Sequence, residues 1–268
     1  MVDRTQLGVV EFGRVLLETE DLDPLYVILY KSGMKRAQLC RWLVCYFCYY
    51  HAGLSCWASE QRKFWATLDR IARAGTEYPR GTERRHFRGK LAIESIQRMR
   101  EGFSTAEEVV DYWAEGGPTA SGVCDRVTSL YGFGEWIKWK VPDVLERLGL
   151  ARVDFVEDDL DLMFSTSKEG AEEVCEVCRV GGRAVLHSAH RYLLQELGSY
   201  KAPPRYERAI NVQETETIFC KWHSHRTGHY WPGKDTLDIW EGLGRYRKAK
   251  TAQRLLRPLL PLCKRYIP

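Results

Sequence analysis

Apolar residues recur at helical spacing along almost the whole chain, and this periodicity most limits the folds that the chain can adopt. Phe64, Leu68 and Ile71, for example, lie on one face of a helix predicted over residues 61–73. Alternating apolar and polar residues, which are typical of strands, are scarce, and residues 152–156 form the best short candidate. We therefore predict an all-α fold.

Glycine and proline divide this pattern into separate helices. Residues 116–118 (Gly-Gly-Pro) end one helix and Pro203-Pro204 separates two others, while Ser104 and Glu107 have the spacing of a capping box. Pro142 predicts a kink or a restart within its helix. The predicted helices cover residues 39–50, 61–73, 84–101, 104–114, 119–131, 135–148, 168–179, 184–197, 206–225, 235–250 and 251–260.

Length and composition limit the class of protein. The 268 residues include 44% hydrophobic and 28% charged residues, which is ordinary for a globular protein and excludes disorder as the main state. No run approaches the roughly 18 apolar residues of a membrane span, and the first residues lack the apolar core of a signal peptide. We expect a single domain of two helical lobes, about residues 25–165 and 166–268, with a cleft between them that holds the functional site.

The nine cysteines do not indicate a disulfide framework, because their number is odd and no export signal precedes them. The pairs Cys175/Cys178 and Cys220/His223 have the spacing of two halves of a zinc site. Both pairs fall inside predicted helices rather than on turns, so we predict no metal site, and a zinc site at these four residues is the alternative.

Basic residues are segregated although the net charge is only +4. Seven Lys or Arg residues lie between positions 80 and 100, and only basic charges follow Glu241, whereas residues 154–176 are acidic. Two separate basic segments favour a surface that binds a polyanion. The alternative is a set of solvated helix faces.

The first candidate site segment is residues 79–89. In the predicted helix Arg84 and Arg88 share a face, and like charges at this spacing repel unless an anion lies between them. Arginine binds phosphate oxygens in a bidentate manner, so this segment predicts a phosphate or diphosphate site. The alternative is a surface helix whose arginines pair with carboxylates of the same chain. The candidate diphosphate ligands are Arg80, Arg84, Arg85, His86 and Arg88.

The second candidate segment, residues 131–150, has a Gly-Phe-Gly turn between two predicted helices. Such a turn can expose backbone amides to a DNA phosphate, with lysines close by. A simple helix cap would explain the same glycines. The candidate DNA-binding residues are Gly132, Gly134, Trp136, Lys138 and Lys140.

The third candidate segment, residues 214–236, combines titratable groups with glycines and aromatic residues. His225, His229 and Asp235 are candidate proton acceptors, and Lys234 is a candidate cation for a leaving phosphate. The alternative is a packed aromatic loop. The signatures of P-loop, dinucleotide-binding and Gly-x-Ser-x-Gly enzymes are absent from the sequence, which disfavours kinase, dehydrogenase and hydrolase activities.

Taken in order, RGTERRHFRG, FGEWIKWKVPDVLERLGL and ETETIFCKWHSHRTGHYWPGKDT resemble the phage α-glutamyl/putrescinyl-thymine pyrophosphorylases, also called amino acid:DNA transferases, over about residues 25–242. The resemblance implies a phage-encoded enzyme of the host cytoplasm, with a fold similar to helix–hairpin–helix DNA glycosylases. It implies a single catalytic domain that acts on DNA in which a separate kinase has pyrophosphorylated 5-hydroxymethyluracil. An amine or hydroxyl group of an amino acid or polyamine would displace the diphosphate, without a cofactor.

The resemblance also suggests roles for the candidate residues. Asp143 or Asp154 would correspond to the glycosylase aspartate, and Cys220 would add to ring carbon 6 if diphosphate leaves by elimination. His223 departs from the lysine-like residue that the family pattern leads us to expect. The candidate catalytic residues are His225, His229, Lys234, Asp235, Asp143 and Cys220. The competing hypotheses are a base-excising glycosylase and a non-catalytic DNA-binding protein.

Overall fold

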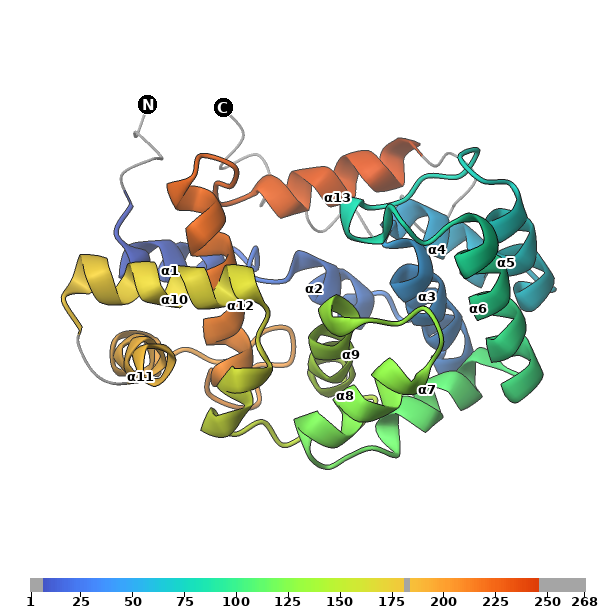
Figure 1. Ribbon diagram of the computed structural model, residues 1–268. Helices are drawn as coiled ribbons and strands as arrows, with labels where there is room; N and C mark the ends of the chain where they lie inside the picture. Colours follow the sequence, from blue (N-terminus) through green and yellow to red (C-terminus); the bar gives the residue numbers. More distant parts are fainter. Residues whose placement is uncertain (1–6, 181–183, 246–268) are drawn as a thin grey trace.

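The computed structural model describes residues 7–180 and 184–245 and is helical throughout this part of the chain (Figure 1). Its α-helices are Val9–Glu18 (α1), Pro24–Lys31 (α2), Arg36–Tyr49 (α3), Ala52–Ser59 (α4), Phe64–Arg73 (α5), Gly89–Gly102 (α6), Ala106–Ala114 (α7), Ala120–Ser129 (α8), Glu135–Arg147 (α9), Ser165–Cys178 (α10), Val185–Leu197 (α11), Val212–Arg226 (α12) and Lys234–Arg245 (α13). Short 3-10 helices cover Thr82–Arg84 and Glu157–Leu162. Within the described residues the only β-type pairs are two isolated bridges, which confirms the all-α prediction.

Most predicted helices are present, but the prediction of one continuous helix over residues 84–101 is wrong. The 3-10 helix ends at Arg84, and α6 begins only at Gly89, whose φ of 57° is left-handed. A chain that passes through this conformation cannot continue a right-handed helix. Arg84 and Arg88 therefore do not share a helix face. The predicted helix over residues 251–260 and the basic residues around it lie outside the described part of the chain.

Other differences are local. The capping interactions of α7 lie one residue later than predicted, because the Thr105 hydroxyl accepts the amide of Glu108 and the Glu108 carboxylate accepts the amide of Ser104. Helices α1, α2 and α4 were not predicted, and α12 begins at Val212 rather than at residue 206.

Two hydrophobic clusters form the core. The first contains buried residues of α2 to α9 together with Leu243 of α13. The second contains residues of α1, α10, α11 and α12, and Trp139 of α9 joins it. Figure 1 shows the two groups of helices on opposite sides of the view, with α2 and α9 between them. The division into lobes at about residue 165 stays a prediction.

Helix α9 contributes residues to both clusters. It continues through Pro142, so of the predicted kink or restart at this proline, the restart does not occur. Proline has no amide hydrogen, so the carbonyl of Lys138 loses its usual helical donor. The thiol of Cys124 donates to this carbonyl at 3.3 Å instead. A neighbouring side chain thus satisfies the carbonyl and lets α9 remain one element. No helix in the described ranges is long and apolar enough to cross a membrane.

Candidate active site

Charged side chains meet in the interior where α9, α12 and the segment that precedes α2 come together. Lys140, Asp143 and Arg147 lie on one face of α9, at the helical spacing of three and four residues. The group, which we call the ionic centre, consists of Asp21, Asp23, Lys140, Asp143, Arg147, Glu214, Glu216 and Lys221. Burying so many charges is costly unless they pair closely, and such clusters are typical of functional sites.

Arg147 connects three carboxylates of the ionic centre. Its Nη1 atom lies 2.8 Å from Glu214, 3.4 Å from Asp23 and 3.9 Å from Asp143, and its side chain is only 2% exposed. The Nε atom donates to the carbonyl of Pro203. Arg147 therefore fixes the ends of α2, α9 and α12 relative to one another.

Lys140 points into the ionic centre. Its Nζ atom lies 3.3 Å from Glu216, whose other oxygen accepts the Ser167 hydroxyl at 2.6 Å. Burial opposes the charge of Lys140, but Glu216, Asp23 and Asp143 outweigh it and raise the lysine pKa. The side chain is 15% exposed and stays cationic, so a DNA-backbone contact, as predicted from the sequence, is not favoured by its direction.

Lys221 and Asp21 bring the loop before α13 to the ionic centre. The Nζ atom of Lys221 lies 2.7 Å from Asp235 and donates to Tyr230 at 3.1 Å. The Asp21 carboxylate accepts the amide of Gly233 at 2.6 Å and the hydroxyl of Thr236 at 2.6 Å. Asp21 thereby anchors the start of α13 and holds Asp235 beside Lys221.

Asp23 differs from the other buried carboxylates because it is held loosely. Its Oδ2 atom has the Arg147 contact and a 3.5 Å contact with the hydroxyl of Thr217, and its side chain is 13% exposed. Burial raises the pKa of Asp23, although Arg147, Lys140 and Lys221 act in the opposite direction. A carboxylate that is desolvated, partly accessible and weakly hydrogen-bonded is well suited to accept a proton.

Asp143 is held more firmly. Tyr26 donates to Oδ2 at 2.9 Å, Gln213 donates to Oδ1 at 2.8 Å, and the carboxylate is fully buried. Burial, followed by the charge of Asp23, raises the pKa of Asp143 to about 6. These contacts favour a positioning role beside Asp23.

The raised pKa of Asp143 predicts how stability changes with pH. The folded chain holds this proton more tightly than the unfolded chain, because the pKa rises from 3.8 to about 6 on folding. Ionising Asp143 therefore lowers the free energy of unfolding as pH rises from about 4 to about 6. The free energy of unfolding should be measured with urea at about pH 4.5 and at about pH 7.5. Between these two pH values, Asp143→Asn should lose roughly 2 kcal/mol less of this free energy than wild type loses. Asp154→Asn, at an exposed carboxylate, should keep the wild-type difference, and the same difference in both variants would contradict the assignment.

Several residues predicted from the sequence reach this region. Asp143 and Lys140 belong to the ionic centre, and Asp235 contacts it through Lys221. Burial, together with the charges of Glu216 and Asp235, raises the thiol pKa of Cys220 to about 12. The charges of Lys140 and Lys221 lower this pKa but do not offset the effect of burial. Cys220 is therefore a neutral thiol at physiological pH, which does not favour nucleophilic addition by it.

The other residues of the third candidate segment point elsewhere. His225 is buried in the second cluster, stacked on Phe12 at 4.8 Å between ring centroids, and its Nδ1 atom lies 2.9 Å from the Tyr230 carbonyl. His229 is exposed beside Thr227, and Lys234 pairs with Asp238 on its own helix. These contacts favour structural roles for His225 and Lys234.

The arginine-rich segment divides into buried and exposed residues. Arg84 is buried and donates to the carbonyls of Cys48 at 3.1 Å and Gly132 at 3.0 Å. Burial lowers its pKa to about 10. Arg80 donates to the carbonyl of Phe87 at 3.0 Å and is half-buried. The side chains available to a ligand in solution are those of Arg85, His86 and Arg88, which are exposed.

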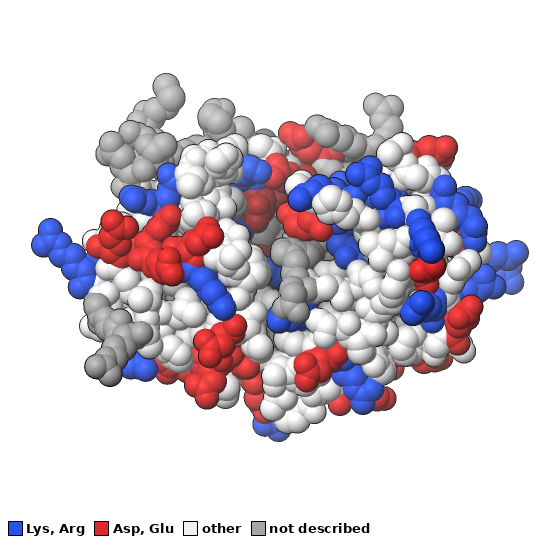
Figure 2. Space-filling model, viewed as in Figure 1, with Lys and Arg blue, Asp and Glu red and all other residues white. Residues whose placement is uncertain are grey.

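The first and third candidate segments approach each other at Glu83. Desolvation raises the pKa of Glu83, and the charge of Asp235 raises it further, whereas Arg85 and Lys234 lower it. These electrostatic effects require the 3-10 helix to lie close to the start of α13. Figure 2 shows basic side chains over this side of the molecule, acidic side chains over α10 on the other side, and a hollow between the two.

The turn of the second candidate segment is fixed by contacts with Ser95 and Arg84. Gly132 has a φ of 85°, and a Cβ atom there would lie 3.1 Å from the hydroxyl oxygen of Ser95. Ser95 donates to the carbonyl of Tyr131 at 2.6 Å, while Arg84 holds Gly132. Gly134 is exposed at the N-cap of α9 and Lys138 is half-buried, while the side chain of Trp136 lies outside what the structure describes. Binding of DNA by this turn stays a prediction.

The structure offers no clear metal site in its described ranges, since no group of three His, Cys, Asp or Glu residues is arranged to hold an ion. His223 pairs with Glu173 at 2.9 Å and with Glu169 at 3.3 Å, and the thiol of Cys175 donates to a backbone carbonyl. Through these two glutamates of α10, His223 connects α12 to α10.

Sequence analysis assigned no site role to six members of the ionic centre, namely Asp21, Asp23, Arg147, Glu214, Glu216 and Lys221. One signal was available, because Asp23-Pro24 is the pattern of an N-cap followed by proline at the first helical position. It would have identified the start of α2 and drawn attention to Asp23. No comparable local signal indicates that Arg147 and Lys221 face the same interior group.

Comparison with known proteins identifies the family of the chain. A family model described as amino acid:DNA transferase matches residues 14–230. The glycinyltransferase of Pseudomonas phage PaMx11 is 34% identical over 276 residues, covering 92% of this chain and 94% of that protein. The putrescinyltransferase of Delftia phage PhiW-14 is 26% identical over 275 residues, covering 94% of this chain and 82% of that protein. The predicted resemblance and the prediction of a transferase are confirmed, and the chain belongs to the amino acid:DNA transferase family.

Proposed function

We propose that the enzyme transfers an amino acid or polyamine to the 5-methylene of pyrophosphorylated 5-hydroxymethyluracil in duplex DNA, with release of diphosphate. Family membership supplies the transfer of an amino acid to DNA. The observation that carries the finer assignment is Asp23, a desolvated and weakly held carboxylate among Lys140, Arg147 and Lys221. This combination offers a proton acceptor beside cations that can neutralise a leaving anion.

The proposed reaction forms one bond and breaks one bond. The lone pair of the donor amine forms a C–N bond to the 5-methylene carbon, and the C–O bond to diphosphate breaks with its electron pair on the leaving oxygen. The proton that the amine loses passes to a carboxylate oxygen of Asp23. The charges of Lys140 and Lys221 act on Asp23 and lower its pKa, and the same charges would favour departure of diphosphate.

The DNA must present the modified base outside the helix stack. Extruding a base costs a few kcal/mol, which contacts with the protein have to offset. The exposed Arg85 and Arg88 and the turn before α9 are proposed to hold the DNA backbone during this step. Displacement in one step and elimination of diphosphate followed by addition of the amine use the same acceptor. The substrate is phage DNA, so we place the reaction in the cytoplasm of the host.

The test is nucleoside mass spectrometry after incubation with pyrophosphorylated DNA and one donor at a time. We expect a nucleoside heavier by the donor residue and an equal amount of diphosphate, with glycine and putrescine as first donors because relatives carry those names. Free base with an abasic site would instead indicate a glycosylase. Tight binding to duplex DNA without any change in the nucleosides would indicate a non-catalytic DNA-binding protein.

A further inference from the structure

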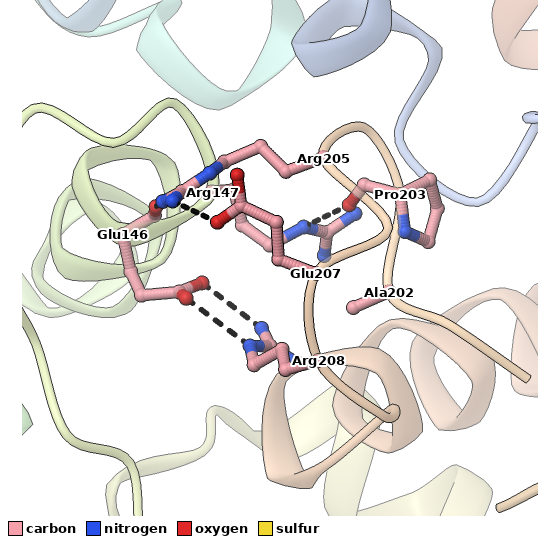
Figure 3. Close-up of a pocket in the computed structure, with 7 residues that line it drawn as sticks. All are labelled: Glu146, Arg147, Ala202, Pro203, Arg205, Glu207 and Arg208. Atoms are coloured by element: carbon pink, nitrogen blue, oxygen red, sulfur yellow. Dashed lines mark hydrogen bonds and ion pairs between the residues drawn. The ribbon is translucent and has the colours of Figure 1, made fainter.

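A cavity of about 150 Å³ opens where the end of α9 meets the loop over residues 202–208 (Figure 3). Its lining consists of Glu146, Arg147, Ala202, Pro203, Arg205, Glu207 and Arg208. Ligand pockets for larger compounds begin at roughly 300 Å³, so this cavity suits a small and highly polar molecule. Its guanidinium groups favour an anionic group on that molecule.

Arg147 reaches from the ionic centre to the cavity wall. Its Nη1 atom contacts Asp23 and its Nε atom donates to Pro203, whereas its Nη2 atom is buried without a partner in the described part of the chain. A buried guanidinium nitrogen without an acceptor is unfavourable, and native structures rarely leave one. Arg147 lines the cavity, so an oxygen of a ligand that enters it is the candidate for this missing acceptor.

Arg205 provides a second cation that a ligand can recruit. It pairs with Glu207 at the surface, where the two side chains are 32% and 59% exposed, and such exposed pairs contribute little to stability. Gly149 leaves room for it, because a Cβ atom there would lie 3.1 Å from Nη1 of Arg205. Arg208, by contrast, is held by Glu146 and Glu214 and forms a fixed wall. A carboxylate in the cavity can therefore replace Glu207 on Arg205.

We propose that this cavity is the donor site and that it binds an α-amino acid through its carboxylate, between Arg147 and Arg205. The proposal rests on the proposed function, because the bound molecule is the donor of that reaction. In an α-amino acid the amine is two bonds from the carboxyl carbon, so a donor held by Nη2 of Arg147 stays close to the nitrogen that contacts Asp23. A donor without a carboxylate, such as a polyamine, gains nothing from these arginines.

Binding is tested first, without DNA, by calorimetric titration of the full chain. Glycine, acetate, putrescine and diphosphate are used one at a time and in competition. We expect glycine and acetate to compete for one site and putrescine not to compete. Arg205→Gln should weaken glycine binding about tenfold, since a charge-assisted hydrogen bond is lost. Arg73→Gln, at another exposed arginine that pairs with a carboxylate, should have no effect.

Glu207→Gln provides a test in the opposite direction. Glu207→Gln removes the carboxylate that pairs with Arg205. Glycine binding should become several-fold tighter, because the glycine carboxylate no longer has to displace the Glu207 carboxylate from Arg205. This variant alters only an exposed side chain, so it keeps the fold. Unchanged glycine affinity in both Arg205→Gln and Glu207→Gln would overturn the proposal, as would diphosphate competing with glycine for the cavity.

Steady-state kinetics separates this proposal from the proposed function. In Arg205→Gln the KM for glycine should rise about tenfold while kcat and the affinity for DNA stay at their wild-type values. If wild type binds glycine in the cavity but transfers no donor, the proposed function fails and the binding site remains. If wild type transfers glycine and the variant keeps the wild-type KM, the donor-site proposal fails and the function remains.

Discussion

Asp23→Asn is expected to lower kcat for donor transfer by about 10²- to 10⁴-fold, which is the range that proton transfer by a positioned side chain contributes. Asparagine preserves the size of the side chain but cannot accept the proton that the donor amine must lose. Asp23 has only long contacts with Arg147 and Thr217, so the substitution removes no strong hydrogen bond. Burial opposes the charge of Asp23, and the neutral variant should therefore fold with wild-type stability. The measurement is single-turnover formation of the modified nucleoside, together with DNA affinity and melting temperature.

Asp154→Asn is the matched control for this prediction. Asp154 was an alternative to Asp143 as the counterpart of the glycosylase aspartate, but it pairs with Arg152 at the surface and is 49% exposed. It lies apart from the ionic centre, and its substitution should leave kcat within about twofold of wild type. A result with normal turnover in Asp23→Asn and a large loss in Asp154→Asn would place the proton acceptor elsewhere.

Arg84→Ala is expected to lower the free energy of unfolding by about 3 kcal/mol, because it removes a buried hydrogen-bonding group and leaves a void. The guanidinium of Arg84 joins the end of α3, at the Cys48 carbonyl, to the turn before α9, at the Gly132 carbonyl. It also lies over the ring of Phe87, at 4.1 Å from the ring centroid. Urea or thermal unfolding of the full chain measures the loss.

The neighbouring arginine provides the control for this second prediction. Arg85 is exposed, so Arg85→Ala should change the free energy of unfolding by less than about 0.5 kcal/mol. The diphosphate-binding role predicted from the sequence leads to a different expectation for Arg84→Ala and Arg88→Ala: turnover on modified DNA falls by more than duplex binding does. An Arg84→Ala variant with the wild-type melting temperature but a low turnover rate would favour diphosphate binding by Arg84 over a structural role.

The helical pattern made much of the fold predictable. Helices such as α5 and α11 have apolar residues at helical spacing and polar residues elsewhere, so local sequence suffices to place them. The same reasoning went wrong at residues 84–88. The charge pattern there is compatible with a helix, but Arg84 gains carbonyl partners in the core and Gly89 adopts a left-handed conformation. Interactions with distant residues outweighed the local preference for a helix.

The candidate site was only partly predictable for a related reason. Asp143, Lys140 and Asp235 could be singled out because they lie in segments with unusual composition. Asp23 lies in a short loop outside the three candidate segments, and Arg147 and Lys221 lie within two of them without a local feature that distinguishes them from the other charged residues there. Their importance arises from their partners, and those partners are far away along the chain.

By itself the sequence determined the all-α class, most helix positions and the three segments that resemble the family, because these features depend on residues within one or two helical turns of each other. Only the tertiary structure decided which charges meet. Arg147 contacts Asp23 across 124 positions, and Tyr26 contacts Asp143 across 117. The physical reason is that burial and pairing set the protonation and the direction of each charged group, and both arise only when the helices pack.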